Sequence, residues 1–139
     1  APAPATEGRI SSIPTKSADE LYAAARTDMD SQRYDRAIDN LPAFTAQNPR
    51  DTRIPDARLR LADAYVAQRR YTEAIAEYAA LAREFPDSPL LPTALYRQAQ
   101  ALLAAGDHAG CRMLQDVADR YPQSPEAALA RETLSTRCR

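Results

Sequence analysis

The sequence repeats itself with a period of about 37 residues, and this repeat limits the fold more than any other feature. The segment Gln32–Ile38 (QRYDRAI) returns as Arg69–Ile75 (RRYTEAI). A proline follows each copy at corresponding positions, Pro49 and Pro86, and a third equivalent, Pro122, lies 36 residues further on. Self-similarity at this spacing is typical of helical solenoids, in which each unit packs against its neighbours in a row.

Each unit is predicted to contain two helices, which we call helix A and helix B. In the second unit, Pro55 suits the first turn of helix A, and Pro86 ends helix B. The third unit matches this pattern between Pro92 and Pro122, with a turn at Gly106 and a helix B that is one residue shorter. Apolar residues recur at helical spacing in the second unit, at Leu61, Ala62, Tyr65, Ala74, Ile75, Tyr78 and Leu81.

The two ends of the repeat region carry helix-start signals. Ser17 and Glu20 form a capping-box pattern, which predicts that the first helix begins there. Ser124, followed by Pro125, predicts a last helix that runs toward Cys138 and caps the final apolar face. Within helix B of the first unit, Pro42 removes a backbone donor and is predicted to kink the helix.

The composition argues against several classes of function. The 18 basic and 19 acidic side chains give a net charge of -1, so the basic surface of a nucleic-acid-binding or membrane-surface protein is not expected. No apolar run approaches the roughly 20 residues that a membrane span needs, so no membrane insertion is expected. The chain begins at Ala1 without a signal-peptide pattern, and we expect it to be a processed chain or a piece of a longer one.

No arrangement of residues predicts an active site, a metal site or a cofactor site. General acid–base catalysis needs two carboxyl groups in different environments, whereas the acidic pairs here lie on Arg-rich helices and are expected to be solvated. The single histidine, His108, falls in a turn between helices and is expected to pack or to be exposed rather than to bind a ligand. The acidic pairs are Asp28 with Asp30, Asp35 with Asp39, and Glu73 with Glu77.

The two cysteines, Cys111 and Cys138, do not form a zinc-binding pattern. Cys111 is predicted to replace the small buried residue of helix B, represented by Ala37 and Ala74 in the earlier units. Two interpretations stay open at this point. Either the cysteines form a disulfide in an oxidising compartment, which would stabilise the fold by about 3 kcal/mol, or both thiols are buried and reduced.

These repeats resemble the tetratricopeptide repeat family. The resemblance rests on Ala74-x3-Tyr78 followed by Pro86, and on small residues at equivalent positions of the three A helices, and it covers residues 18 to 139. It implies an all-α, right-handed superhelix of three helix pairs and a capping helix, over residues 17–139, after a Pro/Ala-rich linker at 1–16. The implied repeats are 18–51, 55–88 and 92–123, with the cap helix at 125–138.

In this family the A helices line a concave face that binds partner proteins. The register places Tyr22, Leu59 and Tyr96 at equivalent positions on that face, as an apolar stripe outside the inter-helix core. The alternative interpretation is that this register packs between neighbouring A helices. The predicted partner-binding residues are Tyr22, Arg26, Met29, Asp30, Leu59, Asp63, Val66, Tyr96, Gln100 and Leu103.

The loops carry a narrower resemblance. Residues 84–96 (EFPDSPLLPTALY) and 120–125 (RYPQSP) are similar to the C-terminal domain of the Tol-Pal accessory protein family YbgF, also called CpoB. This resemblance implies a periplasmic, non-catalytic protein that binds TolA and helps coordinate cell-wall synthesis with outer-membrane constriction in cell division. A cell-wall synthase is a further candidate partner, and full-length members are trimeric through an N-terminal coiled coil.

Two alternatives to a groove-binding adaptor follow from the same repeats. The domain could be a purely structural module whose repeats space or oligomerise another domain. It could also be an outer-membrane assembly scaffold, because lipoproteins of the BamD class carry similar Pro- and Ser-rich repeats.

Overall fold

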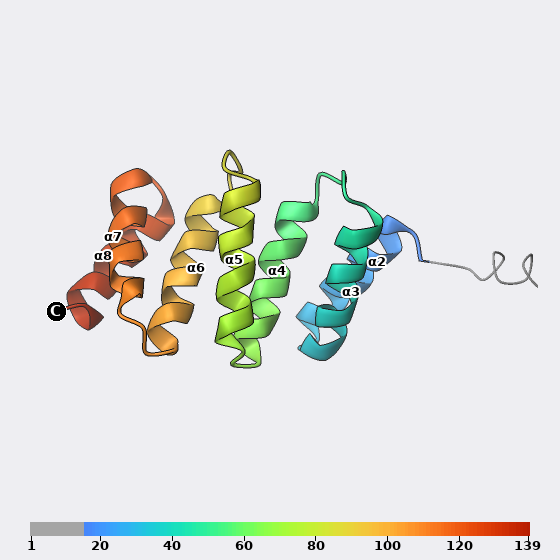
Figure 1. Ribbon diagram of the computed structural model, residues 1–139, viewed down its shortest axis with the longest axis horizontal. Coiled ribbons are helices and arrows are strands. Elements are labelled where there is room, and N and C mark those ends of the chain that lie inside the picture. The colour runs from blue at the N-terminus through green and yellow to red at the C-terminus, as the bar shows by residue number, and fades with distance from the viewer. Residues whose placement is uncertain (1–15) are drawn as a thin grey trace, which may run out of the picture.

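The computed structural model describes residues 16–139 and places them in seven helices, with no strand in that part of the chain. The helices follow one another in a row from α2 at one end to α8 at the other (Figure 1). The all-α repeat fold is therefore confirmed. The predicted linker at 1–16 lies outside the described residues except for Lys16. The helices are α2 (Ala18–Asp30), α3 (Tyr34–Gln47), α4 (Ile54–Ala67), α5 (Tyr71–Glu84), α6 (Leu91–Ala104), α7 (Ala109–Arg120) and α8 (Pro125–Arg137).

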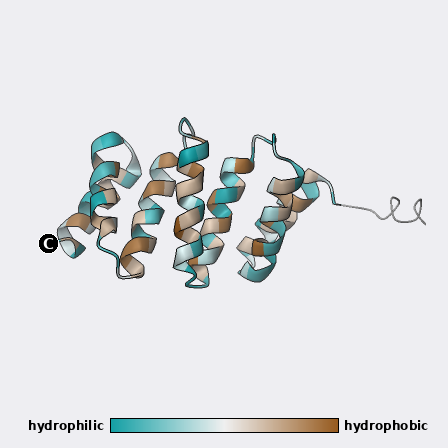
Figure 2. Cartoon of the chain, in the orientation of Figure 1, coloured by the Kyte–Doolittle hydropathy of each residue, from teal (hydrophilic) through white to brown (hydrophobic). Residues whose placement is uncertain are grey.

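The core is a series of three clusters along the row rather than one central core. The first lies in α2, α3 and α4 around Phe44, the second in α4, α5 and α6 around Tyr78, and the third in α6, α7 and α8 around Leu114. Figure 2 shows apolar and polar residues side by side around every helix, as expected when each helix buries one stripe. Each unit therefore depends on its neighbours for burial.

The turn from helix A to helix B has the same geometry in all three units. A residue with positive φ ends each A helix: Gln32 (59°), Arg69 (60°) and Gly106 (83°). The amide of the following residue donates to a carbonyl five residues back, at 2.7–2.8 Å, which is the Schellman motif. Only the third unit uses glycine, the residue that adopts positive φ without strain.

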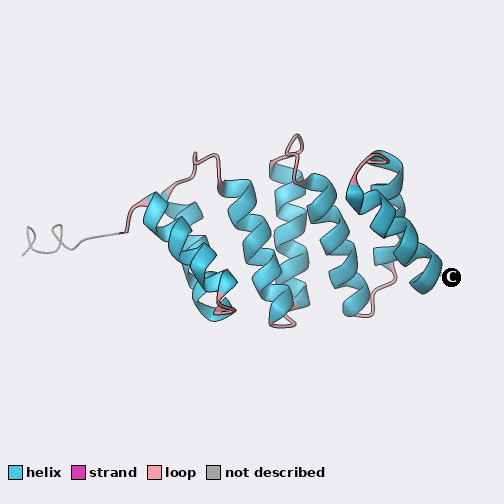
Figure 3. Ribbon diagram, turned by 180° about the vertical axis from the view of Figure 1, so that it is seen from behind, coloured by secondary structure: helices cyan, strands magenta, loops and turns pink. Residues whose placement is uncertain are grey.

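The loops from helix B to the next helix A also share one hydrogen-bond pattern, and they lie at the opposite end of the helices from the short turns (Figure 3). In each, the amide of a polar residue donates to the carbonyl three residues back, and its own carbonyl accepts from the amide three residues on, at 3.0–3.2 Å. The polar residue is Asp51, Ser88 or Ser124, and its side chain also accepts from a backbone amide. The three loops therefore share one backbone geometry, although only Ser124 is itself an N-cap, since α4 and α6 begin without a side-chain cap.

The predicted helix starts agree with the structure to within one residue. Ser17 and Glu20 form the predicted capping box, and Ser124 caps α8 with Pro125 as its first residue. Helices α4 and α6 begin one residue before Pro55 and Pro92. The cap helix α8 ends at Arg137 instead of residue 138.

Helix α3 continues through Pro42, and the predicted kink at that residue stays a prediction. The helix is assigned without interruption from Tyr34 to Gln47, although Pro42 cannot donate to the carbonyl of Ile38. The Pro42 carbonyl accepts from the hydroxyl of Thr45 at 3.0 Å. A single proline is therefore accommodated inside this helix.

Gly110, rather than Cys111, occupies the small buried position of the last helix B, so the prediction for Cys111 was wrong. Gly110 is buried, and a Cβ atom built on it would lie 2.6 Å from the carbonyl oxygen of Ala99 and 2.8 Å from Leu103 Cγ. Ala37 and Ala74 lie five residues after their positive-φ residues, whereas Gly110 lies four after Gly106. The missing residue therefore falls in the turn, and it shifts Cys111 out of the buried register.

We predict that replacing Gly106 or Gly110 by alanine destabilises the protein, but for a different physical reason at each position. Gly106→Ala meets open space, so it should lose only the cost of positive φ, about 1 kcal/mol. Gly110→Ala should cost about 1–3 kcal/mol by forcing α6 and α7 apart, despite the better helix propensity of alanine. Urea unfolding of both variants measures these costs. An unchanged or higher midpoint for Gly110→Ala would contradict the close approach of α6 and α7.

Candidate functional site

The predicted partner-binding residues all lie on the A helices α2, α4 and α6, but they differ in exposure. Arg26, Asp30 and Gln100 are exposed. Leu59 has only 6% of its surface exposed and belongs to the second core cluster, together with Tyr78 and Leu81. The expectation that Leu59 lies outside the inter-helix core was therefore wrong. The half-buried members are Tyr22, Met29, Asp63, Val66, Tyr96 and Leu103.

Tyr22 is also occupied in packing between units. Its hydroxyl donates to Asp56 of α4, and its ring lies 5.3 Å from the Phe44 ring, centroid to centroid. The Arg53 guanidinium lies over both rings, 5.0 Å from the Tyr22 centroid. The contacts of Tyr22 and Leu59 therefore fit the alternative interpretation, in which these equivalent positions pack between neighbouring A helices.

Arg53 joins the first unit to the second. Its guanidinium nitrogens contact Asp51 at 2.8 and 2.9 Å and Asp19 of α2 at 2.9 Å. The hydrogen bond from the Arg53 side chain, followed by that from the Arg53 amide, lowers the pKa of Asp51 to about 2. Such a bidentate contact fixes orientation as well as charge. The loop after α3 is thereby held against the start of α2.

A hollow of about 480 Å³ opens between α4 and α6, beside α5. It brings together three of the predicted residues, Asp63, Val66 and Gln100. Tyr22, Arg26 and Met29 are not among the residues that line it. The other lining residues, none of which was predicted to bind a partner, are Ala67, Tyr71, Tyr78, Arg97, Ala101 and Ala104.

One edge of the hollow is a partly buried polar link between the second and third units. Asp63 of α4 accepts a hydrogen bond from the Tyr78 hydroxyl at 2.5 Å and forms an ion pair with Arg97 of α6. Burial raises the pKa of Asp63, opposed by the Tyr78 hydrogen bond and by the charges of Arg97 and Arg60. Burial and the Asp63 charge also raise the pKa of Tyr78, so its hydroxyl stays a donor. The link fixes the width of the hollow.

The floor and the far rim of the hollow are small or apolar. Ala67 and Ala104 are exposed at its rim, and the short side chains there leave room that a larger residue would fill. Gln100 is exposed and donates to the Tyr96 hydroxyl at 2.8 Å. An apolar cavity with a few polar groups at its edge is the usual composition of a binding pocket. The alanines at exposed positions were a signal in the sequence that could have indicated this hollow.

The acidic pairs do not all lie in solvent as expected. Asp28 has only 6% of its surface exposed and accepts from Asn40 at 3.0 Å, and burial raises the pKa of Glu77. Glu73 is half-buried and pairs with Arg70 at 2.6 Å.

His108 is exposed at the start of α7. Within residues 16–139, no group of three or more His, Cys, Asp or Glu residues is placed to hold a metal ion.

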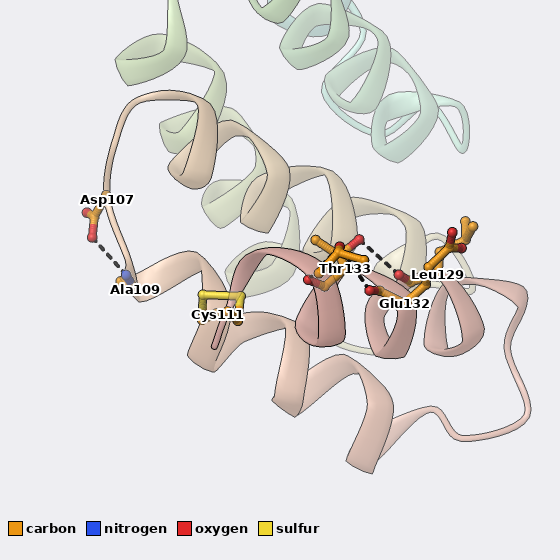
Figure 4. Close-up of a disulfide and its surroundings, with 8 residues drawn as sticks. Asp107, Ala109, Cys111, Leu129, Glu132 and Thr133 are labelled. Atoms are coloured by element: carbon orange, nitrogen blue, oxygen red, sulfur yellow. Dashed lines mark hydrogen bonds between the residues drawn. A yellow bond between two sulfur atoms is a disulfide. The ribbon is translucent and has the colours of Figure 1, made fainter.

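Cys111 and Cys138 form a disulfide. The structure therefore agrees with the first of the two interpretations, the bridge, and not with two reduced thiols. Their Cα atoms lie 5.8 Å apart, and the bond joins the first turn of α7 to the residue directly after α8 (Figure 4). This separation is within the range of unstrained disulfides. The bridge fixes the last helix of the row against the third unit.

The low pKa of Asp51 predicts a loss of stability in acid. An unfolded chain protonates this carboxyl near 3.8, whereas the folded chain does so only near 2. The stabilising contribution is therefore present above about pH 4 and is lost as the pH falls toward 2. Asp51→Asn should reduce the fall in urea midpoint between pH 4 and pH 2.5. The same change at Asp116, an exposed residue of α7, is the matched control and should leave the fall unchanged.

The burial of Leu59 predicts a large effect on stability. Leu59→Ala should lower the free energy of unfolding by about 2–4 kcal/mol, because it leaves a cavity in the second cluster. Val66→Ala, half-buried on the same helix, should cost less than half as much. Urea unfolding of both variants at one pH gives the comparison, and equal costs would place Leu59 outside the core after all.

Two comparisons with known proteins bear on this architecture. The comparison with curated proteins finds no match. No helix within residues 16–139 combines the length and the apolar character that crossing a membrane requires. The tetratricopeptide repeat family matches two overlapping stretches, residues 22–89 and 59–125. The first stretch runs from within α2 to the loop after α5, and the second runs from within α4 to the start of α8. Together these stretches cover most of the chain, which therefore belongs to the tetratricopeptide repeat family.

Proposed function

We propose that this domain is a periplasmic interaction module of the Tol-Pal system that binds a segment of TolA in the hollow between α4 and α6. In this role it helps coordinate cell-wall synthesis with outer-membrane constriction during division. Tetratricopeptide repeats are protein–protein interaction modules and are generally non-catalytic. The Tol-Pal role rests on the resemblance of the loops at 84–96 and 120–125.

The hollow is the observation that carries the binding proposal. Its volume of about 480 Å³ is enough for one or two large side chains, and its floor and rim are lined by Ala67, Ala101 and Ala104. Arg97 and Gln100 lie at the edge as donors for the backbone carbonyls of a bound segment. A pocket that takes an apolar anchor, surrounded by polar groups, is where binding energy is concentrated in protein interfaces.

The disulfide supports the periplasmic assignment. Disulfides persist in oxidising compartments such as the bacterial periplasm and are rare in the cytosol. The bond between Cys111 and Cys138 is therefore consistent with export of this chain.

The alternative function is a purely structural role, and two packing contacts support it. Tyr22 and Leu59, two members of the predicted stripe, are engaged in packing between helices. If the domain only spaces or oligomerises other parts of a protein, as in a BamD-like assembly scaffold, the hollow would bind no partner. The two functions therefore differ in whether filling the hollow matters.

Filling the hollow tests the proposal. Ala104→Phe places a large side chain at an exposed rim position, so it should block a bound segment without disturbing the core. Binding of purified TolA, measured by isothermal titration calorimetry, should weaken at least about tenfold, which is about 1.4 kcal/mol. The thermal midpoint should stay within a few degrees of the parent.

The matched control is Ala76→Phe. Ala76 is exposed on α5 and does not line the hollow, so this variant should bind TolA like the parent. Normal binding by Ala104→Phe would show that the partner docks elsewhere. No measurable binding of TolA to the parent chain would contradict the TolA assignment and favour the structural alternative.

A further inference from the structure

The last helix, α8, is connected covalently to α7 at both of its ends. The loop of residues 121–124 joins the end of α7 to the start of α8. At the other end, the disulfide joins Cys138, the residue directly after α8, to Cys111 in the first turn of α7. The two antiparallel helices thus form a closed ring, with the loop and the disulfide at opposite ends (Figure 4).

The apolar packing of α8 is slight for a helix of 13 residues. Its fully buried side chains are Ala127 and Ala130, each of which contributes one methyl group to the core. By comparison, α7 buries Leu114 and Val117, and α4 buries Ile54, Leu59 and Leu61 among others. Burial energy scales with apolar area, so α8 is held by less of it than its neighbours.

The polar contacts that join α8 to the rest of the chain are concentrated at its start, whereas the side-chain hydrogen bonds of its second half go to its own carbonyls. Ser124 caps its first turn, and Glu126 accepts from the Thr93 hydroxyl of α6 at 2.7 Å. Beyond Ala130, the residues packed on the third cluster are Leu134 and Cys138, both only partly buried. The second half of α8 therefore depends on one leucine and on the disulfide.

We propose that the disulfide acts as a redox-sensitive latch, which keeps the second half of α8 on the third unit only while it is closed. Reduction by a dithiol supplies two electrons and two protons. The Sγ–Sγ bond breaks, Cys111 and Cys138 each become a thiol, and the dithiol is oxidised to its own disulfide. Residues 131–137 then leave the third cluster and uncover its apolar side chains, including Leu114, whereas the first turn of α8 stays anchored.

The latch predicts a local change on reduction, which hydrogen–deuterium exchange with mass spectrometry can measure on the whole chain. Without the closed ring, amide protection in residues 131–137 should fall by about 100-fold, the size expected for losing a loop constraint of this length. Protection in α2 to α6 should stay unchanged. The oxidised form of the same dithiol is the control for solvent effects and should change nothing.

A variant without sulfur separates the latch from side effects of the reductant. The double variant Cys111→Ser, Cys138→Ser should show the same local loss of protection without any dithiol. Full protection of residues 131–137 in that variant, or in protein whose two thiols have been confirmed by alkylation and mass measurement, would overturn the proposal. Loss of protection across all seven described helices would also overturn it, because the disulfide would then maintain the whole domain.

Discussion

The close approach of helix A to helix B within each unit is the constraint on which the rest of the structure depends. Small residues make it possible. Gly110 shows the limit, because any Cβ there would meet the carbonyl oxygen of Ala99 on the facing helix. When two helices lie this close, the large residues around the contact, such as Tyr78 and Leu114, interlock instead of holding the helices apart. The residues with no exposed surface at this approach are Ala25, Ala37, Ala62, Ala74 and Ala99.

The A helices of neighbouring units are offset by about one turn, and this offset determines which residues meet between neighbouring A helices. Equivalent residues are 37 apart, but the residues in contact are 34 apart: Tyr22 with Asp56, and Asp63 with Arg97. Each residue thus meets the one that lies a turn before its own equivalent. Within this common offset, the Tyr22 hydroxyl donates to Asp56, whereas its equivalent Leu59, which has no polar group, packs in the second cluster.

The fold could be predicted from the sequence because it depends on local signals that recur. The repeat period, the capping residues Ser17 and Ser124, and the closing prolines are each sufficient to place a helix boundary to within a residue or two. The site could be predicted only in part. The predicted residues Asp63, Val66 and Gln100 line the hollow, but the inward packing of Leu59 and the contribution of Arg97 depend on how neighbouring helices pack, which the period does not determine.

The position of Gly110 shows how one missing residue changes what a repeat can do. Removing a residue from the turn leaves Gly110 as the small buried residue and rotates Cys111 to a partly exposed position, from which it can reach Cys138. With Ala at the buried position and the normal turn length, as in the first two units, residue 111 would face α6 and could not bridge to α8. The shortened turn and the disulfide therefore belong to one local adaptation. It lies beside α8, the last helix of the described residues, whose exposed side chains include Arg131 and Glu132 as well as the apolar Leu129.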